Sequence, residues 1–587
     1  MYILWGIWWL TKHGNKLILQ FKIHYLFYMT LFTTHIKGFG LYDANKRRFF
    51  LACIFCFLFN FTHAQKYEFG REDSLRGSIT PERAWWDIRF YDLAIKVSPK
   101  DSSISGQNTI YYTVKNPSKI LQIDLQSPMG ISKIEQDGRS LTYKKDGRNV
   151  YFVNLVADQP KGQTKQITIY YSGKPRVAKR APWDGGFSWK KDKNGEPFIA
   201  TSCQELGSSV FWPCKDHMYD EPDSMQIAIT TPKDLMDVSN GRLRKTTDNQ
   251  DDTKTYTWFV ANPINNYGVN INIAKYVHFG EVYDGEKGKL DLDYYVLPEN
   301  LDKAKEQFKQ VKMMLKAFEH WFGPYPFYED GYKLVEVPYL GMEHQSSVTY
   351  GNKYANGYLG RDLSGTGWGL KWDFIIIHES GHEWFANNIT YRDIADMWVH
   401  EGFTNYSESL FTEYYFGKEA ASAYIIGTRK GIRNDRPVQG IYDVNHPGSG
   451  DMYPKMGNML HTIRQIVNDD EKWRLLLRKM NQVFYHKVVT GEQIEHFMSQ
   501  ETGRNLGQVF NQYIRGVKIP VLEYSLKDGY LNYRWTNCVE GFDMPIKASL
   551  TDNNLEFIYP TTSWKSWPCT AKNIRIDENF YVNTSMK

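Results

Sequence analysis

The chain has 587 residues, more than a single hydrophobic core usually serves, so its length predicts two to four domains. Its hydrophobic content of 42% and charged content of 23% are those of an ordinary globular protein. The net charge of +5 is small and dispersed, and there is no basic stripe and no Gly-rich phosphate loop, which argues against nucleic-acid binding.

The first part of the chain has the features of a targeting segment. Lys46-Arg47-Arg48 precedes an apolar run from Phe49 to Phe61, and Thr62-His63-Ala64 follows, with small residues at both ends. This order is typical of a secretory signal peptide over 46–64 that is cut after Ala64. The run is short for a membrane span, although a membrane anchor stays an alternative. We therefore expect an exported protein, periplasmic or secreted, with no stable membrane insertion after cleavage.

Residues 1–45 precede this signal and suggest a start codon assigned too far upstream, so residues 1–64 are left out of the fold prediction. Residues 65–278 are predicted to form an N-terminal β domain. Its period-two segments are 87–97, 109–114, 167–171 and 226–230. Many short strands separated by regular turns predict an antiparallel β saddle or sandwich.

Residues 279–518 are predicted to form a mainly helical domain. Leu301–Phe322 has apolar residues at helical spacing and ends at Gly323-Pro324. Thr490 and Gln493 form a capping box for a helix that runs through Ser499. Further helices are predicted over 372–388, 401–416, 455–467 and 472–486.

After Pro520 the alternating pattern returns, at 522–526, 530–535 and 557–559. Residues 519–587 are therefore predicted to form a small C-terminal β-sandwich domain, and the fold class is multidomain α+β.

Four cysteines lie beyond the signal segment: Cys203, Cys214, Cys538 and Cys569. None has C-x-x-C spacing, so a zinc knuckle is not predicted. Because export permits disulfides, a Cys538–Cys569 pair and four free thiols stay as alternatives.

His378-Glu379-Ser380-Gly381-His382 is an H-E-x-x-H motif in an apolar helical stretch. Residues four apart on a helix share one face, so both imidazoles can reach one ion at about 2.0–2.1 Å. Glu379 lies beside that position as a general base for a metal-bound water. Glu401 supplies a third ligand, which leaves a fourth position open, as in zinc hydrolases. The motif therefore predicts one Zn²⁺ ion held by His378, His382 and Glu401.

The segments Ile377–Thr390 and Asp396–Thr404 resemble the M1 aminopeptidases, the gluzincin family of aminopeptidase N and leukotriene A4 hydrolase. His400 stands where the family usually has Asn, and Thr404 where it has Ala; neither change removes a ligand. The resemblance implies a thermolysin-like catalytic domain. It also implies a zinc metalloaminopeptidase that hydrolyses the N-terminal peptide bond of peptide substrates.

Two further segments resemble the family's amine-binding motifs. Tyr339–Gln345 resembles the G-x-M-E-N motif, with Leu340 and His344 as departures, and implies that Glu343 binds the free α-amino group of the substrate. Thr201–Glu205 resembles the stretch that gives a second amine contact, at Gln204, with Glu205 as the rival candidate.

Tyr453–Arg464 resembles the family's Y-x-K-G stretch, with Met456 in place of the usual Gly. The resemblance implies that Tyr453 donates a hydrogen bond to the tetrahedral oxyanion.

Two other functional hypotheses stay open from the sequence. One is an endopeptidase of the thermolysin kind, or a hydrolase of a non-peptide substrate. The other is a non-catalytic binding protein on the same scaffold, which the retention of all three ligands and of Glu379 disfavours. The sequence predicts no oligomeric state.

Overall fold

A mixed eight-stranded sheet forms the main part of the N-terminal domain in the computed structural model, which describes residues 68–551 and 554–587. The predicted signal segment 46–64 lies outside the described residues. The strands lie in the order β13-β14-β11-β1-β2-β8-β4-β5. Their bounds are β1 Trp86–Ser98, β2 Ser103–Val114, β4 Gly130–Gln136, β5 Arg139–Ser140, β8 Thr164–Gly173, β11 Ser224–Pro232, β13 Arg242–Asp248 and β14 Thr253–Val260.

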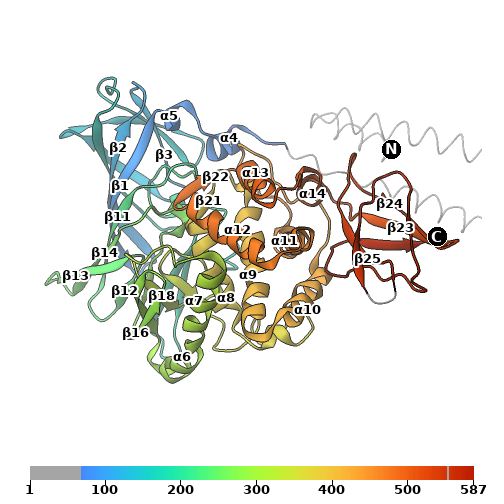
Figure 1. Ribbon diagram of the computed structural model, residues 1–587. Helices are drawn as coiled ribbons and strands as arrows, with labels where there is room; N and C mark the ends of the chain where they lie inside the picture. The colour runs from blue at the N-terminus through green and yellow to red at the C-terminus, as the bar shows by residue number, and fades with distance from the viewer. Residues whose placement is uncertain (1–67, 552–553) are drawn as a thin grey trace, which may run out of the picture. The chain divides into compact units, whose positions relative to one another are not determined.

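The strand pairs of this sheet are antiparallel except for β1 with β11, which run parallel side by side (Figure 1). A parallel pair needs a long crossover, and here the chain between the two strands supplies β2, β4, β5 and β8 of the same sheet and strands of two smaller sheets. One of them contains β3 (Ile120–Asp124), β6 (Thr142–Asp146) and β7 (Val150–Asn154). The other contains β9 (Gly186–Lys191), β10 (Pro197–Ser202), β12 (Met236–Val238) and β15 (Asn272–Ala274). The predicted N-terminal β domain is confirmed.

A five-stranded sheet of order β16-β17-β18-β20-β19 opens the next domain. Its bounds are β16 Val277–Gly285, β17 Gly288–Val296, β18 Tyr332–Glu336, β19 Gly341–Met342 and β20 Val348–Tyr350. The short strand β19 lies at one end of this order, so it is an edge strand and its outer side is not paired within the sheet.

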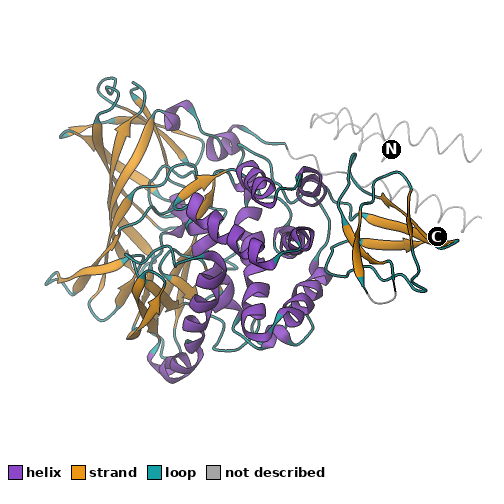
Figure 2. Ribbon diagram, in the orientation of Figure 1, coloured by secondary structure: helices purple, strands orange, loops and turns teal. Residues whose placement is uncertain are grey.

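The helical part gathers around α9 (Trp398–Phe416), which contacts α7, α8, α10 and α11 (Figure 2). The other helices are α4 Arg71–Gly77, α5 Pro81–Ala84, α6 Leu301–Gln307, α7 Lys309–Phe322, α8 Phe374–Gly381, α10 Lys418–Thr428, α11 Pro454–Val467, α12 Asp470–Val483, α13 Gly491–Thr502 and α14 Gly507–Phe510. The capping box of α13 is present as predicted, with Thr490 accepting from the Gln493 N–H at 3.2 Å. Strands β21 (Ile389–Tyr391) and β22 (Lys487–Val489) form a parallel pair beside the helices.

Three predicted helices differ from the structure. The segment 301–322 divides at Phe308 into α6 and α7. The second helix begins at Trp398, before Glu401. The segment predicted over 372–388 ends as an α-helix at Gly381 and continues as a π-helical turn over Glu383–Asn387, because Phe385 and Ala386 have non-helical backbone angles.

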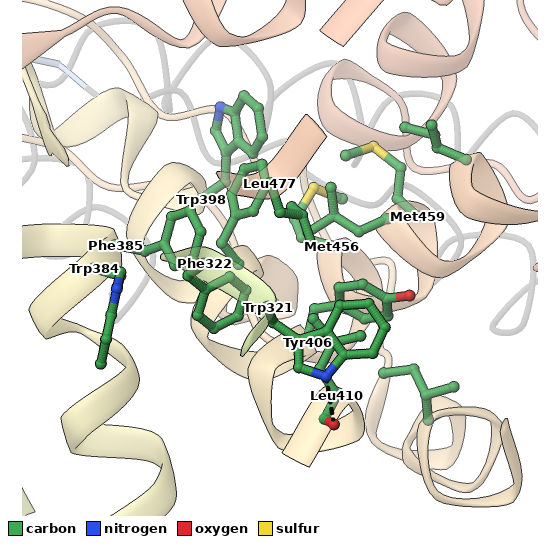
Figure 3. Packing of buried hydrophobic residues seen from close by; sticks show 14 of the residues in the cluster. Trp321, Phe322, Trp384, Phe385, Trp398, Tyr406, Leu410, Met456, Met459 and Leu477 are labelled. Atoms are coloured by element: carbon green, nitrogen blue, oxygen red, sulfur yellow. Dashed lines mark hydrogen bonds between the residues drawn. The ribbon is translucent and has the colours of Figure 1, made fainter. Parts of the chain in front are cut away.

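Large aromatic side chains fix the helices against one another (Figure 3). The indole Nε1 of Trp321 donates to the Leu410 carbonyl at 3.1 Å, which ties α7 to α9. The rings of Phe322 and Phe385 meet edge to face at 5.0 Å. This core leaves α8 and α9 little freedom to shift relative to one another, since interiors of this kind are close-packed.

The C-terminal domain is built from strands, as predicted. One sheet has the order β27-β24-β23-β28 and the other pairs β25 with β26. Their bounds are β23 Val521–Lys527, β24 Tyr530–Thr536, β25 Ile546–Ser549, β26 Leu555–Ile558, β27 Lys565–Pro568 and β28 Asn583–Met586. Cys538 and Cys569 are both free thiols, as are Cys203 and Cys214, so the disulfide alternative is wrong in this structure. No helix within the described residues is both long and apolar enough to cross a membrane.

Candidate active site

The three predicted metal ligands come together at the contact of α8 and α9. His378 and His382 lie on α8 and at its C-terminal end, and Glu401 lies in the first turn of α9. The Oε2 atom of Glu401 is 3.7 Å from His378 Nε2 and 3.3 Å from His382 Nε2. All three side chains are buried. The ligand atoms thus surround a single point.

His378 is oriented by Glu408, one of the residues that the sequence analysis missed. Its Nδ1 donates to Glu408 Oε1 at 2.7 Å, so Nε2 presents its lone pair to the ligand cluster. Glu408 also accepts from the Tyr424 hydroxyl at 2.6 Å and from the Asn405 amide at 3.2 Å. The signal in the sequence was its spacing, since Glu408 follows Glu401 by two helical turns and lies on the same face of α9.

His382 is oriented by the π-helical turn that follows it. Its Nδ1 lies 3.1 Å from the Phe385 carbonyl oxygen and 3.1 Å from Thr404 Oγ1. Since the carbonyl can only accept, Nδ1 carries the proton and Nε2 is free to bind a metal. Thr404, which stands where the family usually has Ala, therefore adds a polar contact behind this ligand.

The donor set fits a zinc ion. With metal–ligand bonds of about 2.0–2.1 Å, neighbouring ligand atoms of a tetrahedral site lie about 3.4 Å apart. The separations of 3.3 and 3.7 Å in the structure agree with that value. Glu401 Oε2 is buried and has no hydrogen-bond partner among the described residues, a costly arrangement unless a cation binds there. Burial acts against ionisation of Glu401, but His382 and His378 outweigh it and lower its pKa.

Glu379, which lies between the two histidines in the sequence, has its carboxylate close to His382. Its carboxylate, that of Glu343 and the His382 imidazole each contribute an atom to a group that spans no more than 4.8 Å. Burial raises the pKa of Glu379 to about 7. A carboxylate with such a pKa can accept and return a proton near neutral pH.

Gln204 joins the amine-binding candidates to the metal ligands. It lies just beyond β10 in the N-terminal domain. Its Nε2 donates to Glu343 Oε1 at 2.8 Å and to Glu401 Oε1 at 2.9 Å. Glu205, the rival candidate, lines the same cleft, and burial raises its pKa. Gln204, rather than Glu205, thus forms the hydrogen bond with Glu343.

Glu343 follows the edge strand β19 and is 3% exposed. The Tyr267 hydroxyl, a partner that the sequence analysis missed, donates to Glu343 Oε1 at 3.1 Å. Burial raises the pKa of Glu343. No local pattern indicated Tyr267, because it reaches the site only through the packing of the two domains.

Tyr453 precedes α11 and lies over a metal ligand. Its ring stacks on that of His378 with centroids 6.0 Å apart. Burial, helped by the charges of Glu401 and Glu343, raises the pKa of its hydroxyl well above the usual value. The group is therefore a phenol that can donate a hydrogen bond beside the metal position.

Three residues that depart from the family motifs, His400, Met456 and His344, are fully buried. His400 Nε2 accepts from the Tyr391 N–H at 2.8 Å, and its ring stacks on that of Tyr391 at 4.0 Å. Met456 packs against Gly402, where an added Cβ would lie 2.6 Å from the Met456 Cβ. His344 is buried, and burial lowers its pKa to about 3, so it is a neutral ring.

All seven predicted site residues line one cleft of ≈ 600 Å³. Its remaining walls include the apolar side chains Leu340, Tyr358 and Phe374, with Phe374 stacked on His378 at 5.0 Å. A cleft of this size is typical of a site for a small molecule or a short peptide.

Comparison with known families finds two matches that follow one another along the chain. Residues 89–267 match the description "Peptidase M1 N-terminal domain", and residues 306–513 match "Peptidase family M1 domain". An M1 zinc metallopeptidase from Deinococcus radiodurans, solved with a Tyr-Ser-Ala substrate, has a similar fold. Its TM-score is 0.62 at 20% identity, over 76% of this chain and 98% of that one.

Curated relatives are aminopeptidases and a related hydrolase. The puromycin-sensitive aminopeptidase of Caenorhabditis elegans is 21% identical over 73% of this chain and 47% of its own length. The leukotriene A-4 hydrolase of Xenopus laevis is 23% identical over 62% of this chain and 61% of its own. The chain thus spans about half the length of the curated relatives it matches.

Proposed function

The chain belongs to peptidase family M1, and we propose that it is a zinc aminopeptidase that removes the first residue of peptides, with one ion per chain. The observation that carries the proposal is the hydrogen-bonded chain from Glu343 through Gln204 to Glu401. It sets a buried carboxylate beside the metal position, where a peptide's ammonium group would form a charge-assisted hydrogen bond.

Each residue of the site has a separate role in the proposed reaction. His378, His382 and Glu401 would hold the zinc ion, which would supply an acidified water and polarise the scissile carbonyl. Glu379 takes the proton of the attacking water and returns it to the leaving amine. The Tyr453 hydroxyl donates to the oxygen on which negative charge develops.

Glu343 and Gln204 supply the specificity for the chain end. Their contacts hold the first residue so that the first peptide bond, rather than a later one, lies beside Glu379. A buried carboxylate also disfavours a substrate whose amino group is acetylated, because its charge would then lack a partner. An endopeptidase has no need of such an anchor.

An assay of matched substrates tests the proposal. Purified, zinc-loaded protein should release the first residue from peptides with a free amino terminus, and cleavage of the N-acetylated forms should be far slower. In Glu379→Gln the rate should fall by about 10²–10⁴ while the zinc content measured by atomic absorption stays the same. Glu419→Gln, an exposed carboxylate change on α10, is the matched control.

Two outcomes would contradict the proposal. Equal cleavage of free and acetylated peptides would favour an endopeptidase. An absence of cleavage that is the same in the zinc-loaded wild type and in Glu379→Gln would favour the non-catalytic binding protein.

We also propose that the protein is exported, since residues 46–64 have the order of a signal peptide. N-terminal sequencing of the protein from its native host should then begin at Gln65, and a mature chain that retains residues 46–64 would contradict this.

A further inference from the structure

A second hollow of ≈ 530 Å³ lies next to the metal cleft. Trp183 and Leu340 line both spaces, so the two are adjacent. Trp183 belongs to the N-terminal domain and is 63% exposed, unusual for so large an apolar side chain. Leu359, which also lines the second hollow, is 40% exposed. Exposed apolar side chains around a hollow are typical of a surface that binds a ligand or another protein.

The chain segment from Glu343 back to Val337 connects the two spaces. Glu343 to Leu340 line the metal cleft, and Leu340 to Val337 line the second hollow. Part of this segment is the edge strand β19, and an extended peptide can lie along such an edge. With the amino terminus at Glu343, later residues advance by about 3.3 Å each, so the fourth residue would reach Leu340, three positions along the strand.

Two lysines give the second hollow a positive charge. Lys303 of α6 and Lys353 are both exposed and both line it. Within residues 68–551 and 554–587 neither ammonium group has an ion-pair partner. The one acid in the wall, Glu336, is already engaged, since its two oxygens accept from the Leu297 N–H and the Asn300 amide, each at 2.7 Å.

We propose that the second hollow binds the fourth and following residues of a peptide substrate, and that Lys303 and Lys353 select peptides with a carboxylate there. The carboxylate is either the chain end or an acidic side chain. The inference rests on the proposed aminopeptidase function and adds to it a substrate class. Preferred substrates are peptides of about four to six residues, whose terminal carboxylate reaches the hollow, and longer peptides with an acidic side chain at a position that reaches it. Dipeptides are too short to reach the hollow.

Four peptides with one shared first residue, X, test the proposal on the full-length, zinc-loaded protein. They are X-Gly, X-Gly-Ala-Ala-Ala, the amide of that pentapeptide, and an amide with Asp in fourth place. We expect the pentapeptide acid and the Asp amide to be preferred over the plain amide in kcat/KM. An exposed ion pair changes affinity by about fivefold at most, so the two lysines together should give a preference of a few-fold to tenfold or more.

The variant Lys303→Gln/Lys353→Gln should lose this preference and keep the wild-type kcat/KM for X-Gly, which is too short to reach the hollow. The matched control is Lys305→Gln/Lys316→Gln, which removes two exposed charges from α6 and α7 without touching the hollow and should behave as wild type.

Two results overturn the proposal. One is equal kcat/KM for the pentapeptide acid, the Asp amide and the plain amide in the wild type. The other is an unchanged preference in the lysine variant. In either case cleavage of X-Gly would leave the proposed function intact. If X-Gly and the pentapeptides are all resistant, the proposed function itself falls, and this inference falls with it.

Discussion

The metal side of the site and its amine side are built in different ways. On the metal side, the ligands and their orienting partners come from α8, the π-helical turn and α9, which pack directly on one another. On the amine side, Glu343 follows an edge strand of the catalytic domain, while Gln204 and Tyr267 reach it from the N-terminal domain. The metal side therefore depends on local helix geometry, and the amine side depends on how two domains meet.

This difference predicts separable effects. Changes on the metal side should alter zinc content or kcat, and changes on the amine side should alter KM and the preference for a free amino terminus. Four substitutions probe that separation.

Replacing Tyr453 by Phe should lower kcat by about 10²–10³ with little change in KM. The hydroxyl is removed while the ring that stacks on His378 is kept, so zinc content should stay at the wild-type level. Steady-state kinetics with a metal assay measure both. A rise in KM with an unchanged kcat would show that Tyr453 binds substrate rather than stabilising the oxyanion.

Replacing Glu343 by Gln should lower kcat/KM for free amino termini by about tenfold to a hundredfold, the effect of losing a hydrogen bond to a charged group. The preference over acetylated peptides should shrink with it. The amide oxygen of Gln can still accept from Gln204, so zinc content should not change. Loss of zinc in this variant would contradict the expectation that changes on the amine side leave zinc binding unaffected.

Replacing Glu408 by Gln should weaken zinc binding by about 10–100-fold, because His378 Nδ1 loses its charged acceptor. Dialysis against a graded chelator series, followed by metal analysis, measures this. Glu413→Gln, on the same helix but paired with Arg464, is the control and should keep its zinc. An unchanged zinc affinity in Glu408→Gln would mean that α8 alone orients His378.

Replacing Glu221 by Gln tests the domain contact on which the amine side depends. Burial raises the pKa of Glu221, which lies beside Thr390 of the catalytic domain, from an ordinary 4.5 to about 8. Between these values the unfolded chain releases a proton that the folded protein keeps, so stability present below pH 4.5 is lost as pH rises through about 8.

Gln has no such proton to release. The melting temperature of Glu221→Gln should therefore exceed that of the wild type by an amount that grows from pH 5 to pH 8. The increase is about 2–4 °C for each kcal/mol by which the free energies of unfolding differ. The exposed change Asp158→Asn should show no such trend. A difference that is the same at all pH values would mean that Glu221 titrates normally in the folded protein.

The same division explains what the sequence could predict. His378, His382 and Glu401 were identified because ligand spacing on helices is a local property. Resemblance led to Gln204, Glu343 and Tyr453, and the structure brings all three into the same cleft. Tyr267 was missed because its contact with Glu343 spans two domains, which no periodicity reports.

The fold was likewise predicted correctly where a local sequence pattern determines the element. The amphipathic segments and alternating strands were found where one face is buried, as in β1. The end of α8 at Gly381 was missed because the apolar run continues past it. The helix gives way to the π-helical turn, where Phe385 and Ala386 have non-helical backbone angles and the Phe385 carbonyl meets His382. The pattern of apolar residues does not indicate this local change of backbone.

Gln204 gives the domain contact a direct effect on catalysis. One amide from the N-terminal domain holds an oxygen of Glu343 and an oxygen of Glu401. A separation of the domains by a single hydrogen-bond length would release both carboxylates at once, while the helical core around α9 stayed folded. On heating, catalysis should therefore fail at a lower temperature than the helical core, with the domain boundary as the element that gives way first.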